Sequence, residues 1–307
     1  MRKAHIALLT VGVIYGLNYY VAKGLMPDLI GPSGFITLRV VGGGLMFWVI
    51  LMMVGRQKID RGDWGRLAIC GLTGVAVNQL CFFNGLSLTS PVHASLIMTI
   101  NPIFVLVASS FLLGSKVTGR KLTGIVLGGV GAATLLLLGA GNEVTDNGAS
   151  IRGDALILIN SISYGVYLVV VKPLMAKYKP LTVIAWVFFF GAVFAVPFGV
   201  GEVMEIKWDA FEAEHWQGIV FVIVGTTFLA YLLNVYALGI VEPTVVSIYI
   251  YLQPLIVMLI LGGLVYMGVR ENESDLNIQT AISALAIFTG VWLVSIPNGW
   301  LTSRSKA

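Results

Sequence analysis

Amide and phenol side chains recur inside stretches of the sequence that are otherwise apolar. The amides are Asn18, Asn78, Asn101, Asn234 and Gln253. The phenols are Tyr15, Tyr164, Tyr231 and Tyr249. Aromatic and amide groups together suit an amphipathic solute, which needs a few placed polar contacts in a mostly apolar pocket. We therefore predict that these side chains converge on one small-molecule site, although hydrogen bonding between packed membrane helices is an alternative role for them.

Residue patterns for several other chemistries are missing. The three histidines are scattered, and Cys70 and Cys81 lie too far apart along one helix to form a disulfide. There is no Walker A sequence for ATP. Acidic side chains fall in predicted loops or at helix ends, so we expect no buried carboxylate of the kind that proton-coupled transporters use. We expect no metal, no cofactor and no enzymatic activity.

The elements that must position these residues are membrane helices. Hydrophobic residues make up 57% of the chain and charged residues 11%, with a mean hydropathy of +0.91. Apolar stretches of about twenty residues recur along the chain, each long enough to span a bilayer. The ten predicted helices cover residues 5–23, 34–54, 66–87, 91–113, 121–140, 154–173, 181–201, 216–239, 243–267 and 278–296.

The distribution of basic residues predicts the orientation of these helices. With a cytoplasmic N-terminus, the inner segments carry 14 Lys and Arg residues and the outer segments carry 4. This asymmetry follows the positive-inside rule. We therefore predict that both termini are cytoplasmic, and we expect no nucleic-acid partner.

One stretch occurs twice, at Asn84–Leu112 and at Tyr236–Leu264, with a constant offset of 152 residues. The matched prolines are Pro91 with Pro243 and Pro102 with Pro254. The first pair suits the first turn of a helix. The second pair lies eleven residues deeper, about 16 Å along a helix and near the bilayer midplane.

The deeper prolines predict two interrupted helices in corresponding places of the chain. A proline there removes one backbone hydrogen bond and bends the helix. Such pairs point to the binding site of a transporter. We predict that Pro91, Pro102, Pro243 and Pro254 belong to two gates that bend in turn. Fixed kinks that serve only packing are the alternative.

A polar break at Gly141–Arg152 separates five predicted helices from five. Because five is odd, the second half enters the membrane in the opposite sense. The sequence thus predicts an all-α membrane protein of ten transmembrane helices in two inverted five-helix repeats. The repeats span residues 1–140 and 153–297, joined by an extracytoplasmic linker at 141–152 and followed by a cytoplasmic tail at 298–307.

Two further polar residues have open roles. Arg39 is the one basic side chain well inside a predicted span, where ionisable groups are costly and suggest function. It could instead extend to the outer interface or cap helix carbonyls. His93 follows Pro91 near an outer helix start, where it either bonds a neighbour or contributes to the predicted site.

The two halves, the matched proline hairpins and the ending IFTGVWLVSIP (residues 287–297) resemble the EamA branch of the drug/metabolite transporter superfamily. The resemblance implies a basket-like fold whose cavity is lined by helices 1, 3, 4, 6, 8 and 9. Helices 5 and 10 are implied to lie on the far side. It also implies a bacterial cytoplasmic membrane protein that exports amino acids or related metabolites. Relatives commonly have a compact acidic turn where this chain has the longer Arg270–Asn277 loop.

We therefore expect a secondary transporter that exports a small metabolite by alternating access, with amino acids as the expected substrates. A broad drug or nucleoside exporter of the same fold is one alternative. A membrane sensor or scaffold without transport is another. The expected partners are the small-molecule substrate and the lipid bilayer, with the chain acting as a monomer or homodimer.

Overall fold

A computed structural model describes residues 2–114, 118–139, 150–268 and 278–295 of the chain. The predicted tail and the Arg270–Asn277 loop lie outside these residues, as does the predicted linker apart from residues 150–152. Within the described ranges all regular structure is helical. Eight helical segments there are long and apolar enough to cross a membrane, and two further helices, α7 and α14, complete the predicted ten.

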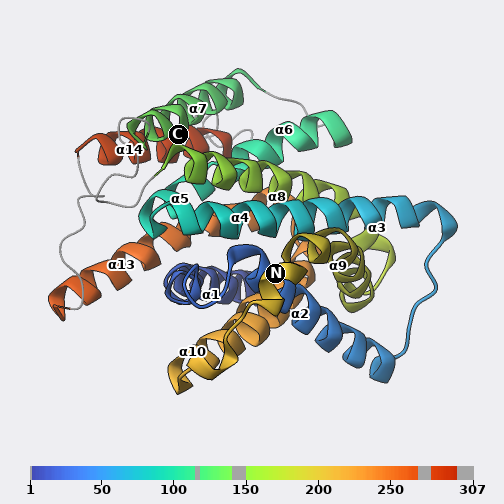
Figure 1. The fold of residues 1–307 in the computed structure, drawn as a ribbon. Coiled ribbons are helices and arrows are strands. Elements are labelled where there is room, and N and C mark those ends of the chain that lie inside the picture. The colour runs from blue at the N-terminus through green and yellow to red at the C-terminus, as the bar shows by residue number, and fades with distance from the viewer. Residues whose placement is uncertain (1, 115–117, 140–149, 269–277, 296–307) are drawn as a thin grey trace.

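The first half of the chain forms five segments, of which the third and fourth are interrupted (Figure 1). In order they are α1 (Arg2–Leu25); α2 (Pro32–Val54); η1, α3, η2 and α4 (Arg61–Asp63, Trp64–Gly71, Leu72–Ala76, Val77–Leu88); α5 and α6 (Pro91–Met98, Asn101–Leu113); and α7 (Gly119–Gly139).

The second half repeats this plan. Its elements are α8 (Ile151–Lys177); α9 (Pro180–Met204); the short η3 (Trp208–Ala210); α10, η4 and α11 (Ala213–Val220, Phe221–Leu229, Ala230–Leu238); α12, η5 and α13 (Pro243–Ile248, Tyr249–Tyr251, Leu252–Tyr266); and α14 (Ile278–Ser295). The all-α fold of two five-helix repeats is therefore as the sequence predicts.

The prolines mark helix starts and helix breaks as expected. Pro91 and Pro243 lie in the first turns of α5 and α12. The helix stops at Met98 and restarts at Asn101, so that Pro102 lies in a new first turn. In the second half a 3₁₀ segment, η5, separates α12 from α13 just before Pro254. Proline lacks the N–H that a continuous helix would need at these points.

The third segment of each half contains a π-helical stretch that the sequence did not reveal. These stretches are η2 and η4, and they occupy corresponding places at the 152-residue offset. Side chains from the second half bind two carbonyls of η2: Ser163 Oγ donates to Thr73 O at 2.7 Å, and the Tyr231 hydroxyl donates to Gly74 O at 3.1 Å. Such π-bulges occur frequently at functional sites.

The two halves interlock. Helix α1 packs against α11 and α13 of the second half, and α8 packs against α4 and α6 of the first half. Matched glycines permit both approaches. A Cβ atom on Gly16 would lie 2.6 Å from Ile256 Cβ, and one on Gly165 would lie 3.0 Å from Phe104 Cβ. Each half therefore supplies its first helix to the hairpin of the other half.

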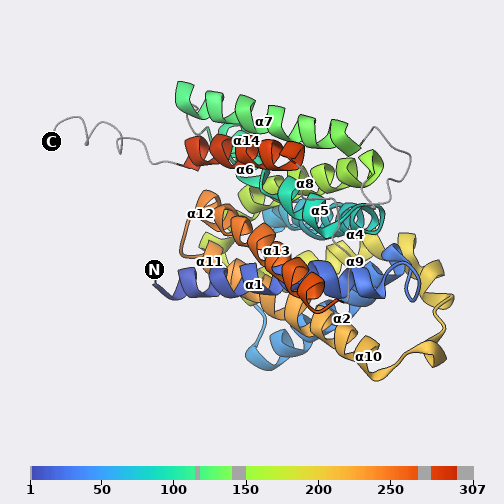
Figure 2. The same cartoon turned by 90° about the vertical axis from the view of Figure 1, so that its left-hand side faces the viewer.

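The remaining helices pair across the halves as well. Helix α2 packs along α9, and α7 packs along α14 at one edge of the molecule (Figure 2). The α7–α14 contact is close because a Cβ on Gly290 would lie 2.5 Å from Gly124 O and from Gly128 N. Large apolar side chains cover the outside, and Leu259 of α13 and Leu45 of α2 are 76% and 62% exposed. That surface suits lipid rather than water.

Two lysines cap the helix ends at the turns between α4 and α5 and between α11 and α12. Lys23 Nζ of α1 donates to Leu86 O and Thr89 O at the end of α4, at 3.1 and 2.5 Å. Lys172 Nζ of α8 donates to Leu238 O and Val241 O at the end of α11, at 2.8 Å each. Leu86 and Thr89 correspond to Leu238 and Val241 at the offset of 152, so the same capping contact is built twice.

Candidate functional site

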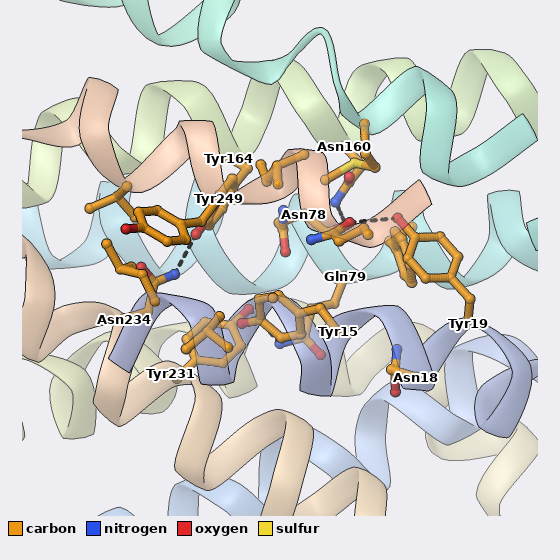
Figure 3. A pocket seen from close by; sticks show the side chains of 18 of the residues that line it. Tyr15, Asn18, Tyr19, Asn78, Gln79, Asn160, Tyr164, Tyr231, Asn234 and Tyr249 are labelled. Atoms are coloured by element: carbon orange, nitrogen blue, oxygen red, sulfur yellow. Dashed lines mark hydrogen bonds between the residues drawn. The ribbon is translucent and has the colours of Figure 1, made fainter. Parts of the chain in front are cut away.

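A cavity lies where the two halves meet (Figure 3). Its empty space is about 730 Å³, open solvent at its mouth included. The predicted site residues that line it are Tyr15, Asn18, Asn78, Tyr164, Tyr231, Asn234, Tyr249 and Gln253. These side chains come from α1, α4, α8, α11, η5 and α13, so both repeats contribute to the cavity.

The interruptions place these side chains. The π segments η2 and η4 end two residues before Asn78 and Tyr231, and Tyr249 lies in η5 beside the cavity. In the interior of a continuous helix, every backbone N–H and C=O bonds within the same helix. The breaks change the direction of the side chains that follow and expose backbone carbonyls to partners from the other half.

Hydrogen bonds fix most of the polar side chains of the lining. Tyr19 OH donates to Gln253 Oε1 at 2.9 Å, and Gln79 Nε2 donates to the Tyr231 hydroxyl at 3.1 Å. Asn234 Nδ2 donates to the Tyr164 hydroxyl. The first two bonds join one repeat to the other, and the third lies within the second repeat, so part of the lining depends on how the halves are packed.

The cavity also includes polar residues outside the predicted set. They are Tyr19, Gln79 and Asn160. Asn160 Nδ2 donates to Asn78 O at 2.7 Å, and Tyr19 lies one turn beyond Tyr15 on α1. Their positions beside predicted site residues could have indicated them: Gln79 is adjacent to Asn78, and Asn160 lies four residues before Tyr164 on the same helix face.

Asn101 does not line the cavity, so that part of the prediction is wrong. Its Nδ2 donates to Ser161 O of α8 at 2.8 Å, and the residue is fully buried between α6 and α8. Its counterpart Gln253 does reach the cavity. The difference arises because α8 packs directly against Asn101, whereas Gln253 accepts from Tyr19 across the cavity wall.

His93 also lies outside the cavity, because it faces a buried acid. Its Nδ1 is 3.1 Å from Asp154 Oδ2, and the Thr89 hydroxyl donates to the other carboxylate oxygen. Asp154 is completely buried in the first turn of α8. The expectation that no carboxylate is buried is therefore wrong. The acid stands at a helix end, but that end is inserted against α5 rather than exposed to solvent.

Arg39 lies in the wall of the cavity and is 3% exposed, so it does not extend to the outer interface. Its Nε donates to Thr227 Oγ1 of η4 at 2.9 Å. Its guanidinium carbon lies 4.4 Å from the centre of the Phe83 ring. Helix 2 thus contributes to the cavity, although the family resemblance did not imply it. The fourth predicted helix, which the structure divides into α5 and α6, contributes only Met98 to the cavity lining.

The described residues that line the cavity lack the acidic and metal-ligating side chains of many enzyme sites. No Asp, Glu, His or Cys is among the lining residues, and no cluster of three metal-ligating side chains occurs anywhere in the described part of the chain. The lining consists of hydroxyls, amides, one guanidinium and apolar groups. It can bind and orient a solute by hydrogen bonds, one positive charge and apolar contact.

The chain is similar to known transporters over most of its length. Residues 2–137 and 151–296 each match the EamA-like transporter family. An uncharacterized transporter of Archaeoglobus fulgidus is 26% identical over 296 residues, covering 95% of this chain and 97% of the relative. A probable terminal-alkyne amino-acid exporter of Streptantibioticus cattleyicolor is 25% identical over 170 residues, 55% of each chain.

Solved structures share the fold, among them one crystal structure of a protein. It superposes with a TM-score of 0.63 at 17% sequence identity and covers 96% of this chain and 97% of its own. Two repeats, a membrane-spanning helical architecture and a family match across both halves agree with one another. This chain belongs to the EamA-like transporter family, and it is a multi-pass membrane transporter.

Proposed function

We propose that the protein exports small polar or amphipathic metabolites, amino acids above all, across the cytoplasmic membrane by alternating access. The observation that carries the proposal is the cavity itself. It is built jointly by both repeats and bordered by helix breaks in each. The relative that is named as a probable amino-acid exporter supports the substrate class.

In this proposal the solute contacts the eight predicted side chains that line the cavity: Tyr15, Asn18, Asn78, Tyr164, Tyr231, Asn234, Tyr249 and Gln253. Amides and phenols offer donors and acceptors, and the aromatic rings offer apolar area. A rigid apolar pocket with a few placed polar groups fixes the orientation of a small solute.

Metabolite profiling tests this function. Bacterial cells that express the protein, and cells that express a Tyr231→Ala, Asn234→Ala variant, are grown side by side. The expected result is that one or a few amino acids accumulate in the medium of the first culture only. Accumulation of drugs or nucleosides instead would favour the broader exporter. Identical media, with both proteins present in the membrane at equal levels, would contradict transport and favour a sensor or scaffold.

The gates are part of the same proposal. The hairpin containing α5 and α6 and the hairpin containing α12 and α13 bend at Pro102 and Pro254, and each closes one mouth of the cavity while the other opens. Pro91 and Pro243 lie in the first turns of α5 and α12, where the second arm of each hairpin begins. We expect Pro102→Ala and Pro254→Ala to restore a continuous helix, favour one facing state and slow transport.

Thiol labelling at cysteines introduced at the two mouths measures the facing state. Pro197 is the matched control, since it lies inside α9 and is exposed on the outer surface. Pro197→Ala is expected to change neither labelling nor transport. If both hairpin variants fold, transport normally and label like the unmodified protein, the prolines are fixed kinks.

A further inference from the structure

Arg39 is a buried positive charge whose contacts leave its terminal nitrogens without an anionic partner. The Nε–H bonds the Thr227 hydroxyl, and one face of the guanidinium lies over Phe83. These contacts orient the group. They do not balance its charge, because a hydroxyl and an aromatic face are neutral.

No acid in the described part of the chain pairs with Arg39. The cavity lining contains no Asp or Glu. The ion pairs of the described residues join His93 to Asp154, Lys177 to Asp60 and Asp63, and His215 to Glu214, and none involves Arg39. An anion strongly stabilises the charge of a buried guanidinium. The planar guanidinium also matches a carboxylate, with which it can form two parallel hydrogen bonds.

Four side chains that line the same cavity carry amide oxygens without a hydrogen-bond donor. Asn18 Oδ1, Gln79 Oε1, Asn160 Oδ1 and Asn234 Oδ1 are buried and have no hydrogen-bond partner, although the amide nitrogens of Gln79, Asn160 and Asn234 are engaged. An ammonium group carries donors only. The residues of the lining therefore combine one cation with several neutral amide acceptors, a set that suits a carboxylate with a nearby ammonium rather than a lipophilic cation.

We propose that Arg39 binds the carboxylate of the transported solute and makes the protein selective for carboxylate-bearing solutes over cationic ones. This inference rests on the proposed export function and assigns its substrate class by charge. Thr227 and Phe83 are positioning residues, since they hold the guanidinium in the wall of the cavity.

A purely structural Arg39 would join α2 to η4 and would affect every solute alike. Carboxylate binding has a different signature, because it depends on the charge of the solute. The test therefore compares solutes that differ only in that group. The twenty L-amino acids are each measured against their own carboxamides, and 4-methylpentanoate and 3-methylbutylamine supply carboxylate alone and ammonium alone.

Binding to the full-length protein, purified in detergent, is measured by thermal stabilisation and by counterflow in proteoliposomes. At least one amino acid is expected to bind roughly ten- to hundredfold more tightly than its carboxamide, the effect of a hydrogen-bonded charge. Arg39→Gln should abolish this preference. Arg39→Lys should retain part of it, because the charge remains and the fork is lost.

Arg56→Gln is the matched control, since it removes the same charge from an exposed residue just beyond the end of α2. It should leave the preference unchanged. If Arg39→Gln does not fold, Arg39→Lys and the comparison of solutes on the unmodified protein still distinguish carboxylate binding from a purely structural role of Arg39.

The outcomes separate this inference from the export function. Carboxamides or amines that bind as well as the acids overturn the role of Arg39, and exported metabolites in the medium would still establish transport. Binding of 4-methylpentanoate without any amino acid supports Arg39 and refutes amino-acid export. If none of these solutes binds, the inference is wrong.

Discussion

At the scale of single residues, burial depends on neighbours that are distant in the sequence. Asp154 looks like a solvated acid at a helix start, yet it is fully buried beside His93 and Thr89. Its place in the first turn of α8 also suits the helix dipole. The carboxylate thus joins the start of α8 to the start of α5, at the end of the first hairpin.

We expect Asp154→Asn to destabilise the protein by about 2 kcal/mol, since it weakens charge-assisted hydrogen bonds that water cannot replace. The measurement is the melting temperature of the purified protein in detergent. The control is Asp28→Asn, the same change at an exposed acid, which should have almost no effect. Equal melting temperatures for the two variants would show that the Asp154 contacts contribute nothing to stability.

At the scale of helices, small residues decide which elements touch. Gly16 and Gly165 let the first helix of each half lie directly on the hairpin of the other half. Small residues at such contacts are the usual means by which membrane helices approach closely, since lipid supplies no hydrophobic drive between them.

We expect Gly16→Ala to force α1 away from α13, because the new Cβ would meet the Cβ of Ile256, which cannot rotate away. Overpacking of this kind costs about 1–3 kcal/mol. Gly24→Ala lies in the same helix with nothing within 4 Å, and it should be neutral or slightly stabilising. Melting temperature and transport rate are measured for both. A Gly16→Ala protein that is as stable and active as the Gly24→Ala protein would contradict the close α1–α13 contact.

At the scale of the whole molecule, the interlocked repeats mean that neither half encloses the cavity alone. Residues of the first half, such as Gln79, find their partners in the second half, such as Tyr231. The basic residues predict how this unit is oriented in the membrane, with both termini in the cytoplasm.

Cysteine accessibility in intact cells tests that orientation. In a background with Cys70→Ala and Cys81→Ala, Asn147→Cys is expected to react with an impermeant thiol reagent. Lys58→Cys, on the exposed segment after α2, should react only after the cells are opened. Labelling of Lys58→Cys but not Asn147→Cys in intact cells would reverse the topology.

The sequence alone determined the helical membrane fold, the division into two repeats and the helix breaks before Pro102 and Pro254. These features follow from local composition: apolar length, proline chemistry and a repeat visible at a fixed offset. It also identified most of the polar residues that line the cavity, because polar side chains inside apolar helices have few places to go except toward one another.

Only the tertiary structure decided which partner each polar side chain has. Asn101 and Gln253 match in sequence, yet α8 covers the first and the cavity receives the second. The π segments, the burial of Asp154 and the unpaired charge of Arg39 also depend on contacts between the halves. Periodicity places a residue on a face of its helix, but the neighbour that this face meets is set by the packing of distant elements.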